Sequence, residues 1–229
     1  MKSKLHHWFD YVKRGLPRSI WVPVRSVATC ILAPIRFSLS TGHGRSSFLM
    51  RAVDRKGKPI PWYTYPAIDF LYQRNYEGKS VLEFGSGQST LWWASRAKSV
   101  LSIEEDPDWF TRMRTQVPGN VELQCIGTNI SIIEDFLKSR GAKFDVIVVD
   151  GNLRREVAAL SFPYLLPGGA LILDNSEGYG FYDEIRHRSC RKIDFFGFAP
   201  GVMLRHCTSI VFVDDCFLLA PDVPIPDLN

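Results

Sequence analysis

From residue 80 onward, short apolar runs alternate with segments that have helical periodicity. The runs are rich in β-branched and other apolar residues; they are SVLEF, SVLSIEE, VELQCI, FDVIVVD and ALILDN. Helical segments such as STLWWASRA and PDWFTRMRTQV separate the first of them. Strands that alternate with helices at this spacing are typical of crossover units. The pattern predicts an α/β domain with a mainly parallel sheet and helices on both faces.

The first 58 residues follow a different pattern. Residues 1–18 place apolar side chains on one helical face, which is typical of a helix on a membrane surface and equally of a helix packed on its own domain. Residues 19–40 are apolar but are interrupted by two prolines and two arginines. Because a spanning helix needs about 20 apolar residues, we expect no membrane span here. Residues 40–60 are rich in Gly, Ser and basic residues and are predicted to form a connector.

Length and charge divide the chain at residue 58. Its 229 residues suit one α/β domain with additions. Residues 1–58 hold 12 Lys and Arg against 2 acids, a charge of +10, whereas residues 59–229 hold 16 bases and 22 acids, a charge of −6. We therefore predict a basic arm over 1–58 and a catalytic domain over 59–229. The arm suits an anionic membrane surface, and the acidic domain offers nucleic acid no basic groove.

The stretch VLEFGSGQST carries a strand directly into a glycine turn. Such turns bring a backbone close to a nucleotide, but Thr90 stands where a dinucleotide fingerprint has its third glycine. Glu83 at the strand end would repel a pyrophosphate and attract a cationic cofactor. S-adenosylmethionine, with its ammonium and sulfonium, has that charge pattern. We expect this cofactor to contact Glu83, Gly85, Ser86, Gly87, Ser89 and Thr90, the last two at a helix N-terminus that suits its carboxylate.

The next two strand ends supply further cofactor ligands. Glu104 lies seventeen residues beyond Gly87, close to the spacing at which an acid binds ribose hydroxyls. Glu105 follows it, and either adenine contact or a role at the start of the next helix would explain this residue. Asn129, in the loop GTNIS after the third strand, is predicted to lie beside the adenine edge.

Three polar residues follow the fourth and fifth strands. Asp150, Asp174 and Asn175 should meet at the carboxyl edge of the sheet, where open α/β sheets bind ligands. A carboxylate there can orient substrate, accept a proton or hold a metal; we expect Asp150 to contact the cofactor as well, and Asp174 and Asn175 to contact substrate. Tyr63 and Tyr65 precede a helix that Pro66 is well placed to start, and we favour a lid over substrate or cofactor above simple core packing.

Together, VLEFGSGQST, SIEEDPDW, FDVIVVDG and LLPGGALILDN resemble the successive motifs of class I S-adenosylmethionine-dependent methyltransferases over roughly residues 78–215. The resemblance implies a Rossmann-like seven-stranded sheet, mostly parallel, whose last strand, here SIVFVDD, is antiparallel. The flanking blocks PWYTYPAIDFL and DFFGFAP also resemble a bacterial subgroup often linked to surface-polysaccharide genes. The expected activity is methyl transfer to an oxygen of a small-molecule or saccharide acceptor, with Asp150 as the proton acceptor.

Asp150, Asp174 and Asn175 are also similar to the magnesium site of catechol-type O-methyltransferases. That family has a catalytic lysine three residues after the first Asp, where this chain has Leu153 followed by Arg154 and Arg155. Mg²⁺ is therefore not favoured as a cofactor. Two alternatives stay open: a nicotinamide-dependent oxidoreductase, and a catalytically silent membrane-associated protein of the same fold. The cysteines lack zinc-site spacing, and we expect a cytoplasmic protein, peripheral at the inner membrane face through its arm.

Overall fold

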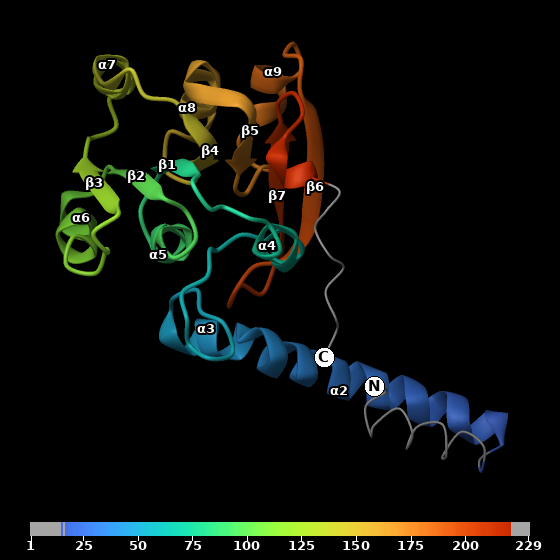
Figure 1. Ribbon diagram of the computed structural model, residues 1–229. Coiled ribbons are helices and arrows are strands. Elements are labelled where there is room, and N and C mark those ends of the chain that lie inside the picture. The colour runs from blue at the N-terminus through green and yellow to red at the C-terminus, as the bar shows by residue number, and fades with distance from the viewer. Residues whose placement is uncertain (1–14, 16, 221–229) are drawn as a thin grey trace.

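The computed structural model describes residues 15 and 17–220, so most of the predicted helix over residues 1–18 lies outside the described residues (Figure 1). The strands are β1 Ser80–Phe84, β2 Ser99–Glu104, β3 Val121–Cys125, β4 Phe144–Val149, β5 Leu165–Leu173, β6 Arg191–Phe198 and β7 Arg205–Phe212. The helices are α2 Arg18–Thr41, α3 His43–Leu49, α4 Tyr65–Tyr72, α5 Gln88–Ala94, α6 Pro107–Met113, α7 Ile130–Arg140, α8 Arg154–Ser161 and α9 Phe181–Ile185. Short 3₁₀ turns cover Phe162–Tyr164 and Phe217–Leu219.

The seven strands form one sheet in the order β3-β2-β1-β4-β5-β7-β6. Strands β1 to β5 pair in parallel, and β7 lies antiparallel between β5 and β6. This confirms the predicted α/β class, the seven-stranded Rossmann-like sheet and its antiparallel last strand. That strand begins at Arg205, a few residues before the predicted SIVFVDD, because it pairs along its whole length with β6.

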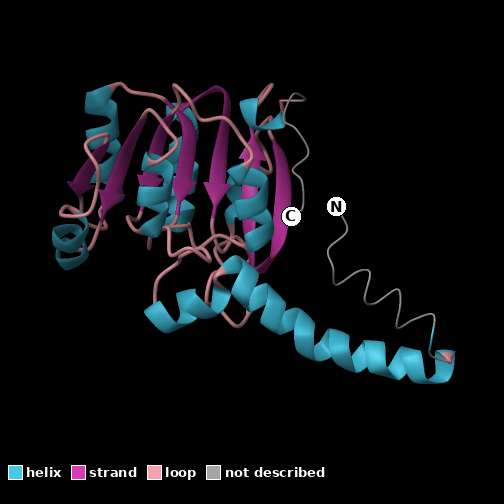
Figure 2. Ribbon diagram, turned by 60° about the horizontal axis from the view of Figure 1, so that its bottom comes forward, coloured by secondary structure: helices cyan, strands magenta, loops and turns pink. Residues whose placement is uncertain are grey.

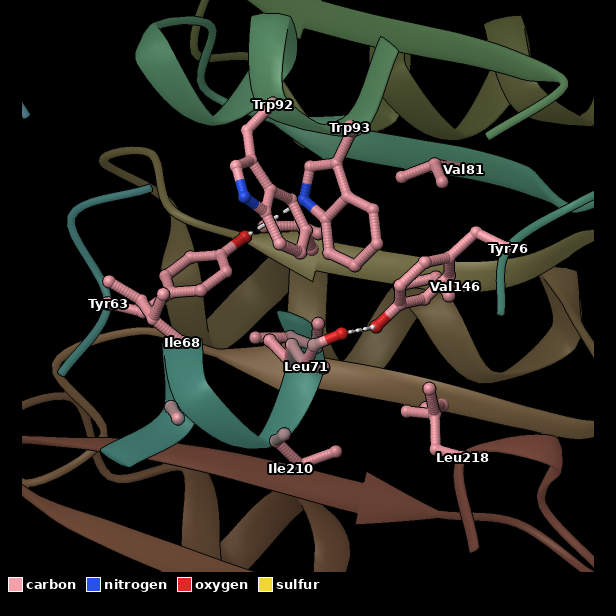
Figure 3. Close-up of a cluster of buried hydrophobic side chains, with 14 of the residues drawn as sticks. Tyr63, Ile68, Leu71, Tyr76, Val81, Trp92, Trp93, Val146, Ile210 and Leu218 are labelled. Carbon is pink, nitrogen blue, oxygen red and sulfur yellow. Dashed lines mark hydrogen bonds between the residues drawn. The ribbon is translucent and has the colours of Figure 1, made fainter. Parts of the chain in front are cut away.

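Two apolar layers sandwich the sheet. Helices α4, α5 and α6 cover one face, and α7, α8 and α9 cover the other (Figure 1). Alternation along β1 assigns Val81 to the first layer and Leu82 to the second. In the first layer the indole rings of Trp92 and Trp93 pack edge to face at 4.7 Å between centroids, close to Tyr63 (Figure 3). The crossover helices therefore anchor a rigid sheet whose carboxyl edge presents the loops.

Helix α2 departs from the prediction for residues 19–40. It runs unbroken through Pro23 and Pro34, which the sequence suggested would interrupt it. A proline removes one N–H donor from a helix, but none of the α2 residues is buried, so water can satisfy the freed carbonyls. By length and composition, α2 is the one helix among the described residues that is apolar enough to cross a membrane; that test alone is weak evidence of a span.

The predicted connector over residues 40–60 is more ordered than expected. It contains α3 and an antiparallel bridge between Val53 and Pro59. The buried Ser46 hydroxyl donates to the Val53 carbonyl at 2.8 Å and accepts from its N–H at 3.0 Å. Figure 2 shows the parallel strands pointing towards the side on which α2 and α3 lie. This segment therefore reaches the edge of the sheet where the candidate site is found.

Candidate functional site

The glycine turn leaves β1 at Phe84 and crosses the end of β4. Gly85 has φ +89°, and a Cβ at this position would lie 2.1 Å from the Asp150 carbonyl oxygen. The protein's own backbone therefore requires this glycine, whereas the sequence had suggested only the approach of a ligand. A Cβ on Gly87 would meet no atom within 4 Å. Gly87 thus faces open space beside the turn.

Glu104, at the end of β2, holds the glycine turn in place. One carboxylate oxygen accepts hydrogen bonds from the Ser86 N–H at 2.8 Å and hydroxyl at 2.5 Å. The other accepts from the backbone N–H groups of Glu105 and Asp106. On the outer side of the turn, the Trp109 indole donates to the Ser86 carbonyl at 2.8 Å. The expected ribose ligand therefore also fixes the loop that carries Ser86.

Glu83 lies behind the glycine turn and is fully buried. One of its oxygens accepts hydrogen bonds from the Thr90 hydroxyl and, at 3.0 Å, from the Ser102 hydroxyl. The other oxygen, Oε1, has no hydrogen-bond partner. The pKa of this carboxyl is raised from 4.5 to about 7, mainly by burial; the charge of Asp150 contributes to the rise, and hydrogen bonding by the hydroxyls of Ser89, Thr90 and Ser102 opposes it. A buried acceptor without a partner is costly, so this carboxylate favours a nearby cationic donor.

Arg154 forms the centre of a second cluster at the ends of β4 and β5. Its guanidinium donates to Asp150 Oδ1 at 2.7 Å, to Asn175 Oδ1 at 2.8 Å and to the Asp174 carbonyl at 2.8 Å. It also lies 3.8 Å from Asp174 Oδ2. Tyr179 covers it, with the guanidinium carbon 4.6 Å from the ring centroid. The three polar residues expected at the sheet edge therefore meet around an arginine.

Burial raises the pKa of both aspartates in this cluster. For Asp150, the Arg154 charge opposes the rise and the Glu104 charge adds to it. For Asp174, the Asp150 charge raises the pKa further, while Arg154 and the hydrogen bond from Thr208 lower it. Asp174 is almost fully buried, whereas the Asp150 side chain keeps 22% of its surface exposed. Asp150 is therefore the acid of the pair that a ligand can reach.

The donor set does not fit a magnesium ion. Mg²⁺ needs carboxylate and amide oxygens that are free to surround it. Here Asp150 Oδ1 and Asn175 Oδ1 already accept hydrogen bonds from Arg154, and the same guanidinium lies 3.8 Å from Asp174 Oδ2, so a cation already occupies the centre of the three side chains. The described residues contain no group of three or more His, Cys, Asp or Glu side chains suited to a metal ion. The guanidinium supplies the positive charge that a metal would otherwise bring to this edge.

A cavity of about 300 Å³ opens above the glycine turn; it is lined by Met50, Arg51, Trp62, Ser86, Gly87, Gln88, Ser89, Trp109 and Asp150. Of these, Ser86, Gly87, Ser89 and Asp150 were predicted for the site, whereas the predicted ligands Glu83, Gly85, Thr90 and Glu104 do not line the cavity. Gln88 and Trp109 were not predicted. Met50, Arg51 and Trp62 were not predicted either, because they come from the segment expected to be a connector or from its immediate neighbour. Met50 and Trp62 are exposed hydrophobic residues, and the sequence alone does not show that they are exposed.

The predicted aromatic lid is wrong. Tyr63 is fully buried, and the Trp93 indole donates to its hydroxyl at 3.2 Å (Figure 3). Tyr65 is also buried and packs edge to face against Phe37 at 5.2 Å. The neighbouring Trp62, 46% exposed, lines the cavity instead. Alternation along an extended segment sends neighbouring side chains to opposite sides, and the sequence did not show which side faces the cavity.

The remaining predicted ligands lie in different surroundings. Thr90 is buried and accepts a hydrogen bond from the Gly87 N–H at 2.9 Å, so it supports the turn from behind. Glu105 accepts from the Asn152 N–H at 2.8 Å, which links the β2 and β4 loops. Asn129 is exposed and caps α7 by accepting from the N–H groups of Ser131 and Ile132. Neither Glu105 nor Asn129 lines the cavity.

Comparisons with known proteins bear on the fold. No protein-family model matches the sequence, and no curated protein matches it. Among similar solved structures, the N-methyltransferase NodS from Bradyrhizobium japonicum is 19% identical, with 64% of this chain and 92% of that chain covered and a TM-score of 0.48. An rRNA methylase from Streptococcus thermophilus is 13% identical, with 65% and 96% covered and a TM-score of 0.45. A precorrin-6y C5,15-methyltransferase from Geobacter metallireducens is 12% identical, with 65% and 86% covered and a TM-score of 0.46.

At these identities the similarity describes the fold alone. The fold is therefore assigned from the sheet of this protein itself. Its strand order, its parallel register from β1 to β5 and the antiparallel β7 are all read directly from the strand pairing. The chain therefore has the seven-stranded Rossmann-like fold that its sequence motifs implied.

Proposed function

We propose that the protein is an S-adenosylmethionine-dependent methyltransferase that methylates a hydroxyl oxygen of a small molecule or saccharide. The observation that carries the proposal is the convergence of Glu83, Glu104 and Asp150 around the glycine turn. Asp150 raises the pKa of Glu83, and Glu104 raises that of Asp150, so their charges act on one another. A concentration of negative charge favours a cationic cofactor and disfavours the pyrophosphate of a nicotinamide dinucleotide.

The cofactor would be held by the backbone of the turn from Ser86 to Ser89 and by the two buried carboxylates beside it. Arg51, which also lines the cavity, suits the cofactor's carboxylate. When bound, S-adenosylmethionine supplies an electrophilic methyl group on sulfur. The work of the protein is then to place an acceptor oxygen in line with that group and to take the acceptor's proton.

Asp150 is the proposed proton acceptor. Its Oδ1 is held by Arg154, which fixes the carboxylate and leaves Oδ2 for an acceptor hydroxyl. Burial moves its pKa upward, towards the pH at which the enzyme would work, and this suits a general base. Asp174 and Asn175 accept hydrogen bonds from Arg154 and are not among the residues that line the cavity, so their proposed role is to orient Arg154.

Replacement of Asp150 by Asn tests this assignment. The amide preserves the shape of the side chain and one acceptor for Arg154, so affinity for S-adenosylhomocysteine should change only a few-fold. Turnover should be lost. The matched control is Asp215→Asn, because Asp215 is an exposed aspartate beyond β7; this variant should keep full turnover. Wild-type turnover in Asp150→Asn would exclude Asp150 as the base.

A small acceptor, and not nucleic acid, is part of the proposal. The cavity is small, and residues 59–229 carry a net charge of −6. Some proteins of similar fold, such as the rRNA methylase noted above, act on RNA, so the distinction needs a test. Methylation of sugars but not of ribosomal or transfer RNA would support the proposal, and the reverse would contradict it.

The division into a basic arm, 1–58, and a methyltransferase domain, 59–229, is also proposed, as is a cytoplasmic location with the arm on the inner membrane face. The alternative of a catalytically silent protein predicts membrane binding without affinity for S-adenosylhomocysteine. Saturable binding of S-adenosylhomocysteine by a protein that also binds membranes would exclude this alternative.

A further inference from the structure

Helix α2 exposes an unusual amount of apolar surface. None of its residues is buried. Its large exposed side chains are Ile20, Val22, Val24, Val27, Ile31, Leu32, Ile35 and Leu39. Both ribbon views show the helix extending well beyond the sheet domain (Figures 1 and 2). Soluble proteins rarely leave a contiguous apolar surface of this kind uncovered.

The arginines of α2 all lie on one side of the helix. Arg18, Arg25 and Arg36 are separated by 7 and 11 residues, so at about 100° per residue they share one narrow stripe. On the same wheel Val24, Ile31 and Ile35 lie more than about 80° from that stripe, together with Ile20 and Val27. The helix therefore has a cationic edge and a broad aliphatic face.

The aliphatic face points away from the domain. Near its C-terminal end, α2 contacts the domain through Phe37, whose ring lies 5.2 Å from Tyr65 and 6.2 Å from Phe198. On the helical wheel Ile31 and Ile35 are about 120° and 160° from Phe37. The groove of about 610 Å³ between α2 and the β6–β7 connection lies on the Phe37 side. Among the residues that the structure describes, the domain thus contacts one side of the helix and leaves the aliphatic side exposed.

We infer that α2 lies flat on an anionic lipid bilayer, with its aliphatic face in the acyl boundary and its arginines at the phosphate level. Charge complementarity favours an anionic lipid surface over a second copy of the protein as the partner of this face. No Asp or Glu occurs between residues 11 and 53, so a second copy of α2 would offer the arginines no counter-charge. This inference extends the proposed peripheral location to a defined helix and does not depend on the cofactor.

The arginine stripe also argues against a span. A helix of 24 residues is about 36 Å long, so a transmembrane orientation would place Arg25 within about 10 Å of the bilayer centre. An arginine at that depth is strongly disfavoured. A flat orientation keeps all three guanidinium groups in the interface while it buries the aliphatic face.

Two valines provide a matched test on the full-length protein. Val24, on the aliphatic face, is 48% exposed, and Val22, near the arginine stripe, is 49% exposed. In co-sedimentation with vesicles of phosphatidylcholine and phosphatidylglycerol, Val24→Gln should weaken partitioning about tenfold, whereas Val22→Gln should change it little. Neither variant should alter thermal unfolding, because neither side chain is buried.

Charge provides the second arm of the experiment. Arg25→Gln should weaken partitioning about fivefold, and vesicles of phosphatidylcholine alone should bind weakly. Equal effects of Val22→Gln and Val24→Gln would overturn the inference. A dimer that Val24→Gln disperses, without any vesicle binding, would assign the face to a second copy. Binding that survives alkaline carbonate extraction would show a span and would equally overturn it.

Discussion

Replacement of Glu83 by Gln should reduce the pH dependence of stability. The pKa of this buried carboxyl is about 7 in the folded protein, against 4.5 as its ordinary value. Between these values the folded protein retains a proton that the unfolded chain releases, so the free energy of unfolding falls as the pH rises. At about 1.4 kcal/mol per pH unit, the gap corresponds to about 3 kcal/mol of stability lost on going from acid to alkaline pH.

Urea denaturation, followed by tryptophan fluorescence at about pH 5 and about pH 8, measures this effect. The neutral amide cannot ionise, so the stability of Glu83→Gln relative to wild type should increase by about 2–3 kcal/mol between the two pH values. The raised pKa values of Asp150 and Asp174 affect both proteins and largely cancel in the comparison. The lost charge should also weaken binding of S-adenosylhomocysteine by roughly 10- to 100-fold.

Glu77→Gln is the control, because Glu77 is exposed in the loop before β1. The stability of this variant relative to wild type should be the same at both pH values. If the stability of Glu83→Gln relative to wild type is also the same at both pH values, the Glu83 carboxyl does not titrate in the folded protein with a raised pKa. The account of a buried, partly unpartnered carboxylate would then be refuted.

Three further predictions concern the turn and the arginine cluster. Arg154→Met leaves Asp150 and Asp174 without their counter-charge and should destabilise the protein by about 3–5 kcal/mol near neutral pH in urea denaturation; wild-type stability would contradict the ion-pair account. Gly85→Ala places a Cβ 2.1 Å from the Asp150 carbonyl oxygen and should lower the melting temperature sharply or prevent folding. Gly87→Ala, where a Cβ meets no atom within 4 Å, should keep the wild-type melting temperature. Equal melting temperatures for the two variants would refute the assigned contact. Chelation of divalent ions should leave the melting temperature and turnover unchanged, and loss of turnover that Mg²⁺ restores would show that Arg154 does not replace a metal.

Strand positions were predictable because each buried strand carries its own apolar run. FDVIVVD and ALILDN became β4 and β5, and the residues after them, Asp150 and Asp174, lie at the expected edge. Parallel strand direction alone places these residues together. The same logic placed Glu83 and Glu104 around the glycine turn.

Other features depended on tertiary contacts that the sequence does not encode locally. The continuity of α2 depended on exposure, which lets water satisfy the carbonyls freed by Pro23 and Pro34. The choice between Trp62 and Tyr63 as the cavity-facing aromatic depended on which side of an extended segment meets the core. The contact of Arg154 with Asp150 requires the first turn of α8 to face the end of β4. From the sequence, only the absence of a lysine at residue 153 could be recognised.

Binding of S-adenosylhomocysteine tests the central claim most directly. Calorimetric titration of the full-length protein, with divalent ions chelated, should give saturable binding to a single class of site. NAD should give no heat under the same conditions. Absence of S-adenosylhomocysteine binding to wild-type protein, or saturable binding of NAD in its place, would contradict the assignment of a methyltransferase cofactor site at the carboxyl edge of this sheet.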